Sequence, residues 1–151
     1  MDEAFWIDRW NRHQIGFHEQ EVNSHLRNFW RDVAPSPSAV VFVPLCGKSR
    51  DILWLRERGH TVIGVELSRV AVNAFFSENG LSARGGRKGR FEVYESEGIR
   101  ILCGNFFDLT PDDVEGVTAV YDRAALVALP HSMQESYVAQ TFRLCNPCTR
   151  A

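Results

Sequence analysis

Two strongly apolar runs, each followed by a segment with helical spacing, limit most how this chain can fold. Residues 39–45 (AVVFVPL) and 60–67 (HTVIGVEL) are rich in β-branched side chains, which is typical of strands buried on both faces of a sheet. The segments that follow, 49–59 and 68–80, each begin with serine and end in glycine. Strand, helix, strand, helix at this spacing predicts a right-handed unit with a parallel sheet.

The other segments predict a helical arm before this unit and more strands after it. In residues 19–33, apolar side chains recur with a 3.6-residue period, which indicates one helix face made of Val22, Leu26, Phe29, Trp30 and Val33. The remaining expected elements are a helical segment before Gly16, a proline-rich break over 34–39, a Gly/Arg/Lys loop over 82–90, strand-like runs over 91–96 and 99–105 that are compatible with a hairpin, a fourth parallel strand over 117–123, and a helix over 131–144 with Met133, Tyr137, Val138, Thr141 and Phe142. The expected fold is therefore α/β, Rossmann-like and doubly wound, with a mostly parallel sheet.

Length, composition and charge favour one domain that works on small molecules. The chain has 151 residues, 44% hydrophobic and 24% charged, and we assign it to a single domain with an arm over 1–34 and a core over 38–145. A formal net charge of -2 argues against nucleic acid as a partner. No stretch approaches the roughly 18 to 20 apolar residues of a membrane span, and the N-terminus is acidic, so we expect a cytoplasmic monomer without membrane contact. Four cysteines are too few for a disulfide framework, and reduced thiols are expected.

The turn after the first apolar run, Gly47-Lys48-Ser49, has the ending of a phosphate-binding loop without its other glycines. The triphosphate-binding spacing requires glycine five residues before Gly47, where this chain has Phe42. A dinucleotide-binding loop requires three glycines, and residues 44–49 contain one. The turn therefore favours a ligand that has no pyrophosphate to bind.

Glu66 lies where a doubly wound fold places its ligand, beyond the carboxyl ends of the parallel strands. It ends the second apolar run, 21 residues after Leu45, at a position where an acid can accept hydrogen bonds from both hydroxyls of a ribose. The alternative is a solvated acid that caps the following helix. An acid for a ribose without phosphate-binding glycines favours a nucleoside cofactor such as S-adenosylmethionine.

Five sequence blocks carry a resemblance to one family. They are FWIDRWNRHQIGFHE (5–19), VPLCGKSRDILWL (43–55), GVELS (64–68), FFDLT (106–110) and YDRAALVALP (121–130). From about Trp6 to Tyr137 the chain resembles the thiopurine S-methyltransferase family, and most closely its bacterial branch. The resemblance implies the class I methyltransferase fold, S-adenosylmethionine as the cofactor and a thiol as the methyl acceptor.

The same resemblance implies particular binding residues. Aromatic faces suit a sulfonium cation and a flat heteroaromatic acceptor, although ordinary packing explains aromatic residues of the arm equally well. An arginine after the fourth strand can pair with the methionine carboxylate, with Asp122 holding it; the alternative is a structural ion pair. The implied set is Trp10, Leu45, Glu66, Asn105, Phe106 and Arg123 for the cofactor and Phe17 for the substrate.

No catalytic base is assigned. Aromatic heterocyclic thiols ionise readily, so the protein must chiefly hold a thiolate in line with the methyl group. His13 and His18 are interpreted as surface residues. Cys145 and Cys148 have a C-x-x-C spacing without a second pair, so no metal is expected, and the basic segment 82–90 is interpreted as a solvated loop.

The leading hypothesis is an S-adenosylmethionine-dependent S-methyltransferase that acts on thiopurines and other aromatic or heterocyclic thiols. The resemblance also suggests selenium or tellurium compounds as acceptors. Residues 143–151 contain no hydrophobic run where the family continues into further strands, so we expect a truncated sheet. The alternative is therefore an inactive remnant that binds the cofactor weakly or not at all. A nucleotide-linked oxidoreductase is disfavoured by the absent glycine fingerprint.

Overall fold

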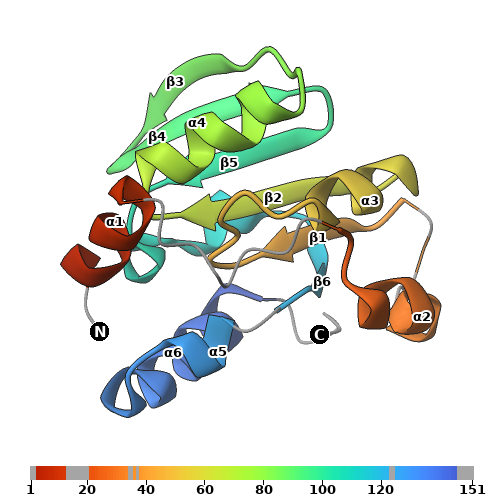
Figure 1. The fold of residues 1–151 in the computed structure, drawn as a ribbon. Helices are drawn as coiled ribbons and strands as arrows, with labels where there is room; N and C mark the ends of the chain where they lie inside the picture. The colour runs from red at the N-terminus through yellow and green to blue at the C-terminus, as the bar shows by residue number, and fades with distance from the viewer. Residues whose placement is uncertain (1–2, 13–20, 34–35, 37, 123–124, 146–151) are drawn as a thin grey trace.

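The computed structural model describes residues 3–12, 21–33, 36, 38–122 and 125–145, with backbone only for residues 3, 6, 33, 127 and 128. These residues form one mixed sheet with helices on both faces (Figure 1). The elements in chain order are α1 (Glu3–Asn11), α2 (Ser24–Val33), β1 (Val40–Val43), α3 (Asp51–Glu57), β2 (Thr61–Glu66), α4 (Arg69–Glu78), β3 (Arg84–Lys88), β4 (Phe91–Ser96), β5 (Ile99–Cys103), the 3-10 turns η1 (Phe106–Asp108) and η2 (Pro111–Val114), β6 (Val117–Val120), α5 (Ala125–Ala128) and α6 (His131–Leu144).

The sheet order is β3-β4-β5-β2-β1-β6, and its last four strands are parallel. The predicted α/β architecture is confirmed, as is the hairpin β4–β5, whose second strand pairs parallel with β2. In the part of the chain that the structure describes, the sheet ends at β6. The carboxyl ends of β1, β2, β5 and β6 meet at one edge, and α1 lies beside that edge near the start of α4 (Figure 1).

Side chains that alternate along the strands build two cores, one on each face of the sheet. Val41 and Val43 of β1 belong to the cluster that packs against α2, α3 and α4, whereas Phe42 belongs to the cluster that packs against α5 and α6. Burial on both faces explains why β1 and β2 read as continuous apolar runs rather than as alternating ones.

Glycines end both helices of the parallel unit as expected, but the predicted serine start holds only for α4, because α3 begins at Asp51 after Arg50, which makes no side-chain cap. The Ser68 hydroxyl accepts a hydrogen bond from the Ala71 amide at 3.2 Å and caps α4. Gly59 (φ 96°) and Gly80 (φ 64°) follow α3 and α4 in the left-handed region, which glycine adopts without steric cost.

The predicted loop over 82–90 is wrong in its central part, because Arg84–Lys88 form strand β3, which pairs antiparallel with β4. Every residue of β3 is exposed. A strand that is solvated on both faces needs no apolar alternation, so its composition gave no strand signal; backbone pairing with β4 alone makes it a strand.

Two apolar helix faces are narrower than predicted. On α2, Leu26 and Trp30 are buried but Phe29 is 56% exposed, and its ring stacks on His25. The buried Trp30 indole donates to His60 Nε2 at 3.0 Å, which fixes the face that α2 turns inward. On α6, Tyr137 is buried whereas Phe142 is 79% exposed. Among the described residues, no helix is both long and apolar enough to cross a membrane.

Candidate functional site

The turn after β1 holds a residue in a strained conformation at the carboxyl edge of the sheet. Leu45 has φ 50° and Gly47 has φ 57°, and Leu45 is the one non-glycine residue with positive φ in the described part of the chain. A left-handed leucine costs roughly 1–2 kcal/mol, and such strain persists where surrounding contacts hold it. One of these contacts is the hydrogen bond from the Cys46 amide to the Val65 carbonyl at 2.9 Å, which ties the turn to β2.

Glu66, the last residue of β2, joins the turns after β1 and β2. It is buried, and its Oε1 accepts from the Gly47 amide at 3.0 Å while its Oε2 accepts from the Ser68 amide at 2.7 Å. Burial raises the pKa of the carboxyl, and the amides of Ser68, Gly47 and Leu67 act in the opposite direction. A carboxylate offers about four acceptor positions, so these two bonds leave capacity for the hydroxyls of a ligand.

Trp10 of α1 covers the same turn. Its side chain is buried, and a Cβ added to Gly47 would lie 3.1 Å from Trp10 Cζ2. The indole therefore lies directly against the backbone of the turn that Glu66 holds from the other side. The structure thus brings three of the predicted residues, Trp10, Leu45 and Glu66, around one turn.

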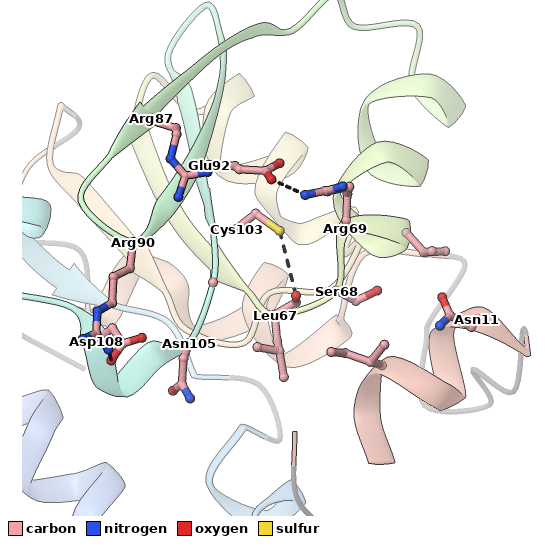
Figure 2. Close-up of a pocket in the computed structure, with 13 residues that line it drawn as sticks. Asn11, Leu67, Ser68, Arg69, Arg87, Arg90, Glu92, Cys103, Asn105 and Asp108 are labelled. Atoms are coloured by element: carbon pink, nitrogen blue, oxygen red, sulfur yellow. Dashed lines mark hydrogen bonds and ion pairs between the residues drawn. The ribbon is translucent and has the colours of Figure 1, made fainter. Parts of the chain in front are cut away.

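A cleft of about 460 Å³ opens at the carboxyl ends of β2 and β5, where Leu67, the residue after Glu66, lines it; Trp10, Leu45 and Glu66 themselves are not among its lining residues (Figure 2). Leu67 and Ser68 line it from the start of α4, Cys103 and Asn105 from the end of β5, and Ile7 and Asn11 from α1, among other residues. Of the predicted cofactor residues, Asn105 lies in this cleft. Its side-chain oxygen accepts from the Phe107 amide at 2.9 Å and caps the turn η1.

Phe106 follows Asn105 directly but lies in the core instead of the cleft. It is 3% exposed, and its ring stacks on Tyr137 at a centroid distance of 4.9 Å and on Phe42 at 6.4 Å. The 3-10 turn η1 sends the two neighbouring side chains in different directions. Of this predicted pair, therefore, only Asn105 has its side chain in the cleft.

Charged side chains line the far wall of the cleft, and most of them were missed by the sequence analysis. Arg69 at the start of α4 pairs with Glu92 of β4 (Figure 2). Glu92 also accepts from the Tyr94 hydroxyl at 3.0 Å. Arg90, in the turn before β4, reaches Asp108 at 3.4 Å. The segment 82–90, which contains Arg90, was interpreted as a solvated loop. Because β3 within this segment pairs with β4, Arg90 lies at the cleft.

Cys103 is another residue of the cleft that was not predicted from the sequence. It ends β5, lines the cleft, and its thiol points toward the Leu67 carbonyl (Figure 2). Burial, followed by the nearby carboxylates of Glu92 and Glu66, raises the pKa of this thiol to about 11. Its place at the end of a parallel strand was the signal that could have identified it.

Two predicted residues, Arg123 and Phe17, lie outside the described residues, as do His13, His18 and Cys148. Asp122, the expected holder of Arg123, has both carboxylate oxygens engaged: Oδ1 accepts from the Ala125 amide at 2.9 Å and Oδ2 from the Tyr137 hydroxyl at 2.7 Å. Within the described ranges, no group of three or more histidine, cysteine or acidic residues is arranged to hold a metal ion.

Solved structures with this arrangement define the class of the fold. A TehB-like S-adenosylmethionine-dependent methyltransferase from Corynebacterium glutamicum aligns over 97% of this chain and 68% of its own, with TM-score 0.60 at 16% identity. The glycopeptide N-methyltransferase MtfA, complexed with S-adenosyl-L-methionine, aligns over 87% of this chain and 54% of its own, with TM-score 0.64 at 16% identity. The chain has the class I methyltransferase fold.

Sequence comparison identifies the family within that class. The family model described as thiopurine S-methyltransferase matches residues 1–151, and the chain belongs to this family. It is 56% identical over 146 residues to the thiopurine S-methyltransferase of Methylococcus capsulatus and 47% identical over 150 residues to that of Nitrosospira multiformis. These matches cover 95% and 99% of this chain but 65% and 68% of the relatives, so the chain spans about two thirds of their length.

Proposed function

We propose that this chain is an S-adenosylmethionine-dependent S-methyltransferase that acts on thiopurines and other aromatic or heterocyclic thiols. The observation that carries the proposal is the geometry around Glu66. A buried carboxylate with remaining acceptor capacity ends β2, a turn without phosphate-binding glycines precedes it, and a cleft opens next to it. Family membership and the class I fold support the same cofactor.

Within this proposal, the site divides into a nucleoside part and a methionine part. Glu66 accepts from the ribose hydroxyls, and Asn105 lines the cleft that receives the adenine. Leu45 and Trp10 contact the cofactor at the β1 turn, and Arg123 binds the methionine carboxylate. Phe106 supports the adenine region from the core through its stacking on Tyr137, and Phe17 borders the substrate.

The reaction requires the protein to orient the reactants and exclude water more than to supply an acid or a base. S-adenosylmethionine supplies an activated methyl group when bound. The residues around Leu45 and Trp10 exclude water and fix the direction of attack, which is worth several kcal/mol of barrier for a well-oriented pair. The acceptor thiol arrives partly ionised, so no general base is assigned. The cytoplasmic location and the monomeric state remain predictions from the sequence.

Calorimetric titration with S-adenosylhomocysteine, followed by a methyl-transfer assay with 6-mercaptopurine, tests the proposal. Binding with turnover is the expected result. Binding without turnover would instead support the remnant predicted as the alternative, and turnover of selenium or tellurium compounds in the same assay would broaden the acceptor class. Tight binding of NAD with no response to S-adenosylhomocysteine would contradict the methyltransferase function altogether.

A further inference from the structure

The turn η1, which follows β5, brings an acidic side chain into the lining of the cleft. The Gly104 amide donates to the Glu66 carbonyl at 3.0 Å, so the chain enters this turn beside the residue that we assign to the ribose. Asn105 caps η1 and Asp108 ends it, and both side chains line the cleft (Figure 2). A 3-10 turn rises about 2 Å per residue, so the backbone of Asp108 lies roughly 6 Å from that of Asn105. A purine ring system is of comparable length.

Arg90 lies against Asp108 because the residue that follows it is fixed in the core. Phe91 is 2% exposed, and a Cβ added to Gly104 would lie 2.6 Å from its Cδ1. Because Gly104 has no side chain, the Phe91 ring packs directly on the backbone just before η1. Arg90 Nη1 then reaches Asp108 Oδ1 at 3.4 Å.

The two carboxylates that line the cleft differ in what they already bind. Glu92 has both oxygens engaged, since Oε1 pairs with Arg69 and Oε2 accepts from the Tyr94 hydroxyl at 3.0 Å. Asp108 has only the contact of its Oδ1 with Arg90, an ion pair that is largely in solvent. Its Oδ2 accepts no hydrogen bond from the residues that the structure describes. Asp108 is therefore the carboxylate of the cleft that has an acceptor position left for a ligand.

We propose that Asp108 selects the base of the cofactor by accepting a hydrogen bond from the 6-amino group of adenine. The inference rests on the proposed function, in which this cleft receives the adenine. An ionised carboxylate only accepts hydrogen bonds. It therefore pairs with an amino group at C6 of a purine and repels an oxygen or a sulfur at the same position.

This selection matters because the proposed reaction brings two purines to one protein. The cofactor carries an amino donor at C6, whereas a thiopurine acceptor carries a sulfur there, which is negatively charged when it is ionised for attack. Like charges placed together in a binding site weaken binding of the wrong partner. Asp108 therefore disfavours the methyl acceptor in the part of the cleft that the cofactor must occupy.

The test compares two ligands that differ only in the base. S-adenosylhomocysteine carries the amino group at C6, and S-inosylhomocysteine carries an oxygen there and a proton on the adjacent ring nitrogen. We expect the unsubstituted chain to bind S-adenosylhomocysteine at least roughly tenfold more tightly in calorimetry, the scale of a hydrogen bond to a charged group. In Asp108→Asn this ratio should fall at least about fivefold, because the amide donates as well as accepts.

The matched control is Asp112→Asn, which changes an exposed acid of η2 that does not line the cleft and should leave the ratio unchanged. Asp108→Ala provides a second variant of the site, and thermal unfolding checks that each variant is folded. An unchanged ratio in both Asp108 variants, or equal affinity of the unsubstituted chain for the two ligands, would overturn the role of Asp108 while the proposed function stands. Failure of the unsubstituted chain to bind either ligand would contradict the proposed function itself, and this inference with it.

Discussion

The two halves of the carboxyl edge of the sheet are built on different principles. Around the turn after β1, the polar groups are buried and bonded inside the protein: Glu66 accepts from two amides, and Trp10 covers Gly47. Beside β5, a cleft is open and its charged wall is exposed, as Arg90 shows with 82% of its side chain in solvent. The half around the β1 turn thus holds the backbone in a fixed geometry, whereas the half beside β5 leaves room for a ligand.

This difference predicts how substitutions act. In the closed half a side chain contributes both to folding and to the proposed site, so stability and cofactor affinity should fall together. In the open half the charges are screened by water and stabilise the fold little, so affinity should change on its own.

The largest expected effect is that of Glu66→Ala in the closed half. It leaves the buried amide of Ser68 and the partly buried amide of Gly47 without their acceptor, and a buried amide left unpaired costs about 1–3 kcal/mol. We expect the free energy of unfolding to fall by about 2–4 kcal/mol in urea denaturation, and S-adenosylhomocysteine binding to weaken by roughly 1–3 kcal/mol in calorimetry.

The matched control for Glu66 is Glu78→Ala, which removes an exposed acid that pairs with Lys48 at 2.8 Å. This variant should lose less than about 1 kcal/mol of stability. An unchanged affinity in Glu66→Ala would remove Glu66 from the site.

Cys103 tests the chemistry of the open half. Because burial raises the pKa of its thiol to about 11, the thiol stays protonated at pH 8, and alkylation by iodoacetamide should be roughly a hundredfold slower than that of glutathione. The rate should keep rising as the pH passes 9, and S-adenosylhomocysteine should lower it because Cys103 lines the cleft. Mass spectrometry with Cys103→Ser as the control assigns the modified thiol. Alkylation at pH 8 as fast as that of glutathione would show that the residue is not shielded.

Gly47→Ala separates backbone strain from packing in the closed half. Both Gly47 (φ 57°) and Gly80 (φ 64°) have left-handed backbones, but a Cβ at Gly47 would meet Trp10 at 3.1 Å whereas nothing lies within 4 Å of one at Gly80. We expect Gly80→Ala to cost about 1 kcal/mol and Gly47→Ala about 2–3 kcal/mol, with a change in tryptophan fluorescence. Equal losses of stability would show that Trp10 does not constrain the turn.

The smallest expected effect is that of Arg90→Ala in the open half. Its ion pair with Asp108 at 3.4 Å is exposed, so unfolding should change by less than about 0.5 kcal/mol, while S-adenosylhomocysteine affinity changes by no more than about fivefold. Arg84→Ala is the control, since Arg84 is equally exposed on β3 but does not line the cleft. A large loss of stability in Arg90→Ala would end the distinction between the two halves.

Much of the architecture was predictable because buried parallel strands and capped helices leave local patterns. The runs that became β1 and β2, and the serine and glycine signals around α4, are visible in a few consecutive residues. Strand β3 was missed since an exposed edge strand has no such pattern. Phe29 was predicted to be buried but is exposed, and Phe106 lies in the core, apart from its neighbour Asn105. The reason is related: a sequence pattern identifies an apolar residue but not the partner that buries it.

The sequence by itself determined the parallel unit and the acid at the end of its second strand, because hydrophobic periodicity and turn chemistry act between near neighbours. Only the tertiary structure decided that Trp10 covers Gly47, that the basic segment before β4 lines the cleft, and that Asp51 meets Tyr121 seventy residues later. These contacts depend on how whole elements dock, since each forms only after the sheet has brought distant segments together.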